Sequence, residues 1–138
     1  MKSFETIEHT ADIGIRAFGS TEAEAFENAA YGMFCLIADL EKVGTRLEFP
    51  VEVEAEEHET LLVEWLNELL YMYESNGVIL KRFHIDELGL TRLKGVAYGA
   101  PVAESQVEIK TDIKAATYYQ LRVEQSEDRW VTEVIFDV

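Results

Sequence analysis

Two segments of this chain repeat their apolar side chains every three or four positions, and segments with strand-like patterns surround them. The segments run from Phe26 to Ile37 and from Leu62 to Tyr73. This spacing gathers the apolar side chains on one face of a helix, and that face must pack against another layer. Thr21 and Glu24 have the spacing of a capping box before the first segment, and Gly77 provides a stop after the second. The sequence therefore predicts two amphipathic helices.

Most of the remaining chain is predicted to form short strands separated by turn residues. The expected strands are Phe4–Ile7, Ile13–Phe18, Val51–Glu56, Val78–Ile85, Leu90–Tyr98, Val107–Ile109, Ile113–Val123 and Trp130–Val138. Neither a linker nor an internal repeat divides the chain, so residues 1–138 are predicted to form a single domain. We expect an α+β fold: a two-layer sandwich with a mostly antiparallel or mixed sheet and both helices on one face. A doubly wound parallel architecture is disfavoured.

The charge of the chain limits its partners. With 27 acidic and 12 basic residues the formal net charge is −15, and such a surface repels phosphate and anionic lipid. Tight direct binding to nucleic acid is therefore not expected. The acidity is compatible with solubility alone or with attraction to a basic protein partner. One cysteine and the lack of a signal peptide or membrane-spanning segment predict a cytoplasmic protein.

No familiar catalytic motif accompanies this pattern. The chain has no phosphate-binding loop, no dinucleotide fingerprint and no nucleophile elbow. His9, His58 and His84 lack the spacing of a zinc site, and His9 is expected to form local hydrogen bonds. Cys35 and Trp65 lie on the apolar faces of the predicted helices and are expected to be buried structural residues. Independent catalysis is not predicted.

Carboxylates near both ends of the chain are the candidate functional groups. Asp137 and the α-carboxylate of Val138 end an apolar strand, and Asp12 precedes the strand that begins at Ile13. Carboxylate oxygens suit Ca²⁺ or Mg²⁺, with water or a partner completing the coordination. Asp12 also fits an ordinary turn or capping role. Lys114, between apolar residues, is either an outward strand residue or a group that neutralises these carboxylates or contacts a phosphate.

Several segments, in order along nearly the whole chain, resemble the archease family. They are the N-terminal signature His9–Gly14, the first-helix segments Ala25–Ala30 and Met33–Phe34, the second-helix segment Leu61–Tyr71, the segment Lys114–Tyr118, and the ending at Asp137. The sequence departs from the family pattern at Gly99 to Ala103 and at Tyr119, where histidine is common.

The resemblance implies an accessory protein, rather than an enzyme, that promotes guanylylation and multiple turnover of the RNA-splicing ligase that joins tRNA halves. It also implies a divalent cation, typically calcium, held by Asp12 and Asp137 with a contribution from Val138, and a functional role for Lys114 in the same patch. The alternative is a chaperone-like modulator of other RNA-processing enzymes, such as a tRNA methyltransferase. A stand-alone metal-dependent phosphohydrolase is a third possibility, which two or three protein ligands support poorly.

Overall fold

The computed structural model describes residues 2–8 and 12–138, which form two antiparallel sheets and three α-helices. In chain order the elements are β1 (Phe4–Glu8), β2 (Ile13–Gly19), α1 (Glu22–Ile37), a 3₁₀ helix η1 (Leu40–Lys42), β3 (Leu47–Glu54), α2 (Thr60–Asn76), β4 (Val78–Leu88), β5 (Arg92–Pro101), α3 (Val102–Ser105), β6 (Ala115–Ala116), β7 (Arg122–Ser126) and β8 (Arg129–Asp137).

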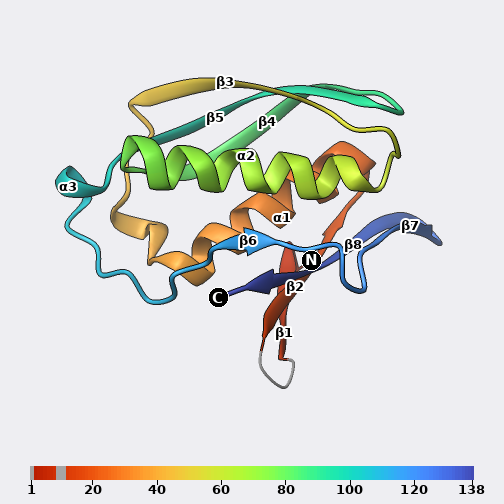
Figure 1. Ribbon diagram of the computed structural model, residues 1–138, viewed down its shortest axis with the longest axis horizontal. Coiled ribbons are helices and arrows are strands. Elements are labelled where there is room, and N and C mark those ends of the chain that lie inside the picture. Colours follow the sequence, from red (N-terminus) through yellow and green to blue (C-terminus); the bar gives the residue numbers. More distant parts are fainter. Residues whose placement is uncertain (1, 9–11) are drawn as a thin grey trace.

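The strands divide into a five-stranded and a three-stranded sheet. The larger sheet has the order β1-β2-β8-β6, with β7 also pairing with β8, and the smaller has the order β3-β5-β4. The predicted α+β class, antiparallel pairing and two long helices are confirmed. Both helices lie between the sheets (Figure 1): α1 packs on β2 and β4, and α2 packs on β3 and β6. The two sheets therefore share one hydrophobic interior, which the helices fill.

Local signals explain where the two long helices begin and end. Thr21 caps α1, because its side chain accepts a hydrogen bond from the Glu24 N–H at 3.1 Å. The Glu24 carboxylate binds back to the Ser20 N–H at 2.8 Å, so the predicted capping interaction is present with its return bond one residue earlier. Gly77 ends α2 in the left-handed conformation, with φ of 64°, and donates to the Tyr73 carbonyl.

The hydrophobic core draws on both helices and both sheets. Its large, fully buried side chains include Ile15, Phe26, Phe34, Trp65, Leu66, Ile79 and Phe136. Trp65 is confirmed as a core residue, and its indole N–H donates to the Phe26 carbonyl at 3.0 Å. Cys35 is half-buried, and burial raises the pKa of its thiol, consistent with the predicted structural role.

The prediction of a continuous strand from Ile113 to Val123 is wrong. The chain forms only the short strand β6, then turns through Gln120, which has φ of 52°, before β7 begins at Arg122. The Asn67 side chain takes both backbone hydrogen bonds of Ala116 on the side away from β8, so no further strand can pair there.

Two other local predictions also differ from the structure. The segment Val107–Ile109 is not a strand; Ile109 forms only an isolated bridge with Ala38. The strand predicted to end at Tyr98 continues as β5 to Pro101, and the divergent residues that follow form the start of the short helix α3.

Candidate functional site

The candidate carboxylates Asp12 and Asp137 lie where β2 begins and β8 ends. Ile13 pairs with Phe136 in the antiparallel register of these strands. Carried one residue beyond the paired segment, this register places Asp12 opposite Asp137. Facing residues of an antiparallel pair project from the same side of the sheet. The fold therefore brings the two carboxylates, 125 positions apart in the chain (137 minus 12), to one end of one sheet.

This end of the sheet faces solvent. Phe136 is fully buried against the helices, and alternation along the strand directs the next side chain, Asp137, to the opposite face. Asp137 is exposed, Val138 is 44% exposed and Asp12 is half-buried. The carboxylates are accordingly accessible to an ion or a partner protein.

Lys114 lies next to this pair through its backbone. Ala115 pairs with Asp137, and the Lys114 N–H donates to the Asp137 carbonyl at 2.8 Å. The Lys114 side chain is exposed. The structure thus groups Asp12, Asp137, Val138 and Lys114, while their roles as metal ligands and functional lysine stay predictions. His9, with Thr10 and Ala11, lies outside the described residues.

Gly14 permits the close approach of β2 and β8 beside the carboxylates. A Cβ atom at this position would lie 2.6 Å from the Val134 carbonyl oxygen and 2.7 Å from the Ile135 Cδ1. Both distances are too short for ordinary packing, so a larger residue would push the strands apart. This contact explains the glycine two residues after Asp12.

The carboxylates along this face of the sheet differ in whether a positively charged side chain forms an ion pair with them. Arg16 binds Glu5 through Nη1 at 2.6 Å and Glu133 through Nη2 at 2.5 Å, and its hydrogen bond holds the pKa of Glu5 below its ordinary value. Within residues 2–8 and 12–138, neither Asp12 nor Asp137 has such an ion pair. Two uncompensated carboxylates at one point favour a cation there.

Asn67 attaches the β6 segment to α2. Its Nδ2 donates to the Ala116 carbonyl at 3.2 Å, and its Oδ1 accepts the Ala116 N–H at 2.7 Å. One turn earlier on α2, Glu64 accepts a hydrogen bond from the Tyr118 hydroxyl at 3.0 Å, which raises the pKa of Tyr118. Sequence reasoning missed Asn67, since an asparagine beside a helix's apolar face resembles any surface residue.

The donor set fits a calcium ion only in part. In the described part of the chain, no three His, Cys, Asp or Glu side chains form a group that holds a metal. Asp12 and Asp137 supply hard oxygen atoms, and the terminal carboxylate of Val138 would add more. Any ion held here would take its remaining ligands from water or from a partner. None of the helices in residues 2–8 and 12–138 combines the length and apolar character needed to cross a membrane.

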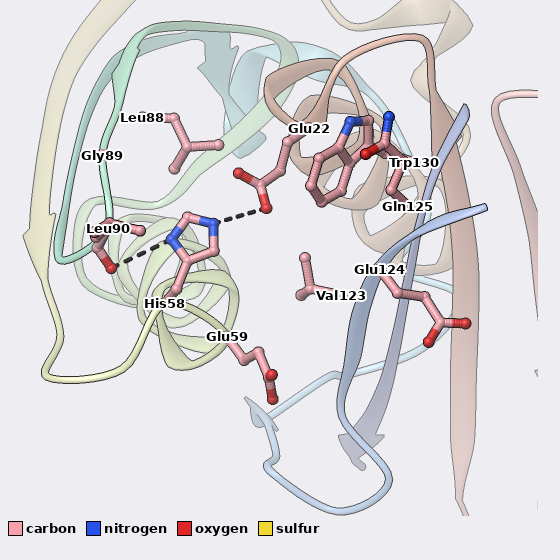
Figure 2. A pocket seen from close by; sticks show the side chains of 10 residues that line it. All are labelled: Glu22, His58, Glu59, Leu88, Gly89, Leu90, Val123, Glu124, Gln125 and Trp130. Carbon is pink, nitrogen blue, oxygen red and sulfur yellow. Dashed lines mark hydrogen bonds and ion pairs between the residues drawn. The ribbon is translucent and has the colours of Figure 1, made fainter. Parts of the chain in front are cut away.

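A hollow of about 580 Å³ lies at the other end of β8 (Figure 2). Its apolar lining comes from Leu88 and Leu90 on one side and Val123 and Trp130 on the other. Trp130 and Asp137 are seven residues apart on one strand, or roughly 23 Å at 3.3 Å per residue. The hollow is therefore separate from the carboxylates.

His58 forms part of the lining of this hollow and joins three elements. Its Nε2 lies 2.7 Å from Glu22 Oε2 at the start of α1, and its Nδ1 lies 3.2 Å from the Leu90 carbonyl oxygen (Figure 2). The ring thus links the turn before α2 to the start of α1 and to the connection between β4 and β5. The sequence placed no role on His58, because its partners are distant in the chain.

Comparisons with known proteins give matches in sequence over nearly the whole chain. The model of the Archease protein family (MTH1598/TM1083) matches residues 4–138. A curated "Protein archease" of Methanosarcina mazei is 40% identical over 141 aligned residues, covering 99% of this chain and 97% of that protein.

Two solved structures share the fold. The solution structure of Methanobacterium thermoautotrophicum protein 1598 has a TM-score of 0.85 and 33% identity, and the match covers both chains completely. The crystal structure of an archease from Thermotoga maritima, described as a possible chaperone, has a TM-score of 0.64 and 28% identity over 97% of this chain and 96% of that one.

Proposed function

Because the chain belongs to the archease protein family, we propose that it is an accessory activator of the RNA-splicing ligase, which promotes GTP-dependent guanylylation and multiple turnover of that enzyme. The observation that carries the proposal is the pair Asp12 and Asp137, which meets beside Lys114 on an exposed end of the sheet without an arginine partner among the described residues. The guanylyl transfer itself takes place in the ligase, so the chain is not an enzyme.

The proposed roles follow from charge. Asp12 and Asp137, with the terminal carboxylate of Val138, would hold a divalent cation, and this all-oxygen donor set suits calcium. When bound, such a cation neutralises phosphate charge and orients the nucleotide. Lys114 adds a positive group beside the same carboxylates and contacts a phosphate oxygen of GTP. The ligase's own nucleophile then attacks, and pyrophosphate leaves.

The test uses the purified ligase with labelled GTP. We expect Asp12→Asn and Asp137→Asn to abolish stimulation of ligase guanylylation, and Lys114→Ala to reduce it about tenfold or more. Asp128→Asn is the matched control, because Asp128 lies in the turn at the opposite end of β8. Stimulation by Asp12→Asn and Asp137→Asn equal to wild type would show the mechanism to be wrong.

One observation favours the second candidate, a chaperone-like modulator of other RNA-processing enzymes such as a tRNA methyltransferase. The hollow beside Trp130 is partly apolar, and Leu90 at its margin is 78% exposed. That function predicts stimulation that survives removal of divalent cations with EDTA and is lost in Leu90→Glu. The ligase proposal predicts the reverse result for both treatments.

A further inference from the structure

The solvent-facing side of α2 carries a tyrosine where a polar residue is expected. Between Leu61 and Met72 most of α2 is buried, and the residues of this stretch that are not buried form one stripe: Glu64, Asn67, Glu68 and Tyr71. Glu64, Asn67 and Glu68 are partly exposed, whereas Tyr71 is 63% exposed. Packing within the chain therefore does not explain this aromatic ring.

The segment 114–118, which contains β6, runs along the same stripe in the direction opposite to α2. Tyr118 bonds to Glu64 and Ala116 bonds to Asn67, so two residues along the segment match three along the helix. One further step brings Lys114 to the level of Leu70, which is buried, and the exposed Tyr71 follows it on the helix, about one turn after Asn67. Lys114 is in turn bonded through its backbone to Asp137. The stripe and the candidate carboxylates thus belong to one continuous surface.

Exposed apolar side chains gather on this surface. Six large ones are exposed in the part of the chain that the structure describes: Tyr71, Leu90, Ile109, Tyr118, Tyr119 and Val138. Tyr118 and Tyr119 follow β6 in the chain, Val138 follows β8, and Tyr71 lies on α2, the helix that packs on β6. The three tyrosines are 63%, 56% and 55% exposed for Tyr71, Tyr118 and Tyr119. We call these three residues the tyrosine surface.

The chemistry of the tyrosine surface suits a basic protein. Tyrosine is enriched at the energetic centres of protein interfaces, and its ring accepts an arginine or lysine against its face. The neighbouring carboxylates of Glu64, Glu68 and Asp137 favour the same cations. RNA itself is disfavoured, because the chain carries a net charge of −15.

We propose that the tyrosine surface is the docking face for the RNA-splicing ligase and contacts basic side chains that the ligase presents beside its RNA site. The inference rests on the proposed function, since an enzyme that binds RNA carries a basic surface of this kind. Docking by the tyrosines and activation by the carboxylates are then separable tasks of adjacent residues.

The experiment measures binding and activation separately. Isothermal titration calorimetry gives the affinity for the purified ligase, and guanylylation is followed as a function of the concentration of this chain. Tyr71→Ala and Tyr118→Ala are each expected to weaken binding about tenfold, yet to reach wild-type stimulation when the chain is saturating. Asp137→Asn is expected to bind and to give no stimulation at any concentration.

Matched variants control for structural damage. Tyr71→Phe keeps the ring and should bind almost as wild type, and Leu90→Ala removes an exposed apolar side chain elsewhere and should leave binding unchanged. Circular dichroism checks that every variant is folded; Tyr71 is exposed, so its truncation is tolerated.

The outcomes distinguish the two proposals. If both tyrosine variants bind normally while Asp137→Asn fails to stimulate, the docking inference is wrong and the proposed function stands. If the wild-type chain neither binds nor stimulates the ligase, both the docking inference and the proposed function are wrong. Tyrosine-dependent binding of a tRNA-half oligonucleotide without the ligase would also overturn the docking inference.

Discussion

Asn67 is a residue whose importance becomes visible only in the folded chain. It satisfies both backbone groups of Ala116, which is almost fully buried, and so holds β6 between α2 and β8. We expect Asn67→Leu to lower the free energy of unfolding by about 1–3 kcal/mol, because it leaves a buried N–H and carbonyl without partners. Urea denaturation measures this change.

Glu68→Leu is the control for that substitution, since Glu68 is adjacent on the same helix and is only partly buried. Its effect should stay within about 0.5 kcal/mol. Equal effects of the two substitutions would contradict the role assigned to Asn67.

Glu27 predicts a pH dependence of stability. Its carboxylate accepts the Ile85 N–H at 2.8 Å, and burial raises its pKa above the ordinary value of 4.5. The folded state therefore retains the proton more strongly than the unfolded state, and this contribution to stability is lost as pH rises through the folded pKa. The Glu27→Gln variant has no carboxyl group to lose a proton at this position. Its free energy of unfolding, relative to that of wild type, should therefore increase between about pH 4 and pH 7.

Glu5 provides the opposite case for the same measurement. Arg16 lowers the pKa of Glu5, so its contribution to stability is present above the unfolded pKa and is lost as pH falls. Glu5→Gln should therefore lose stability relative to wild type as pH rises over the same interval. Slopes of the same sign for both variants would refute these assignments.

Single residues of the candidate site were predictable only where a local pattern marked them. Asp12 and Asp137 are visible as carboxylates at strand ends, and the strand register then brings them together. Asn67 and His58 act through partners 32 to 49 positions away in the chain, and Arg16 joins Glu5, 11 positions away, to Glu133, 117 positions away. No sequence period records such a pairing, so tertiary structure was needed to find them.

The helices were predictable as elements because their apolar spacing is long and their end signals are strong. The strand predictions were less accurate. The prediction began β3 at Val51, but the strand begins at Leu47, since Pro50 interrupts the expected pattern. A proline is tolerated there because β3 is an edge strand of the smaller sheet. The pattern after Ile113 was misleading because a side chain of α2 substitutes for a strand partner.

The β7–β8 hairpin allows a prediction about an element. Its two-residue turn is Glu127–Asp128, between the paired residues Ser126 and Arg129. Glu127 has φ of 54°, a conformation that favours glycine at the first position of such a turn. We expect Glu127→Gly to stabilise the protein by about 0.5–1 kcal/mol in thermal or urea denaturation.

Asp128→Gly is the control, because Asp128 does not have a positive φ and glycine there only adds flexibility to the unfolded chain. It should destabilise the protein slightly. A loss of stability in Glu127→Gly would contradict the assigned turn geometry.

The whole molecule carries a strong excess of negative charge, so added salt can stabilise it in two ways: by general screening of the charges and by specific binding of a cation. Sodium chloride screens the repulsion among 27 acidic side chains and should raise the melting temperature of wild type and variants alike. Calcium chloride should raise it further, at equal ionic strength, in wild type alone. At about 100 times the dissociation constant, bound calcium adds roughly 2.7 kcal/mol.

Asp137→Asn is the decisive variant for this comparison, measured by differential scanning calorimetry. It should respond to sodium chloride as wild type does and lose the additional effect of calcium. An equal calcium effect in both proteins would exclude Asp137 as a ligand.

The central position of β8 restricts how the length of the chain can vary. This strand is flanked by β2 on one side and by β6 and β7 on the other, and its side chains alternate between the interior and the carboxylate-bearing face. A deletion of one residue would exchange the faces, turning Asp137 inward and Phe136 outward. Homologous sequences should therefore tolerate insertions or deletions within this strand only in multiples of two.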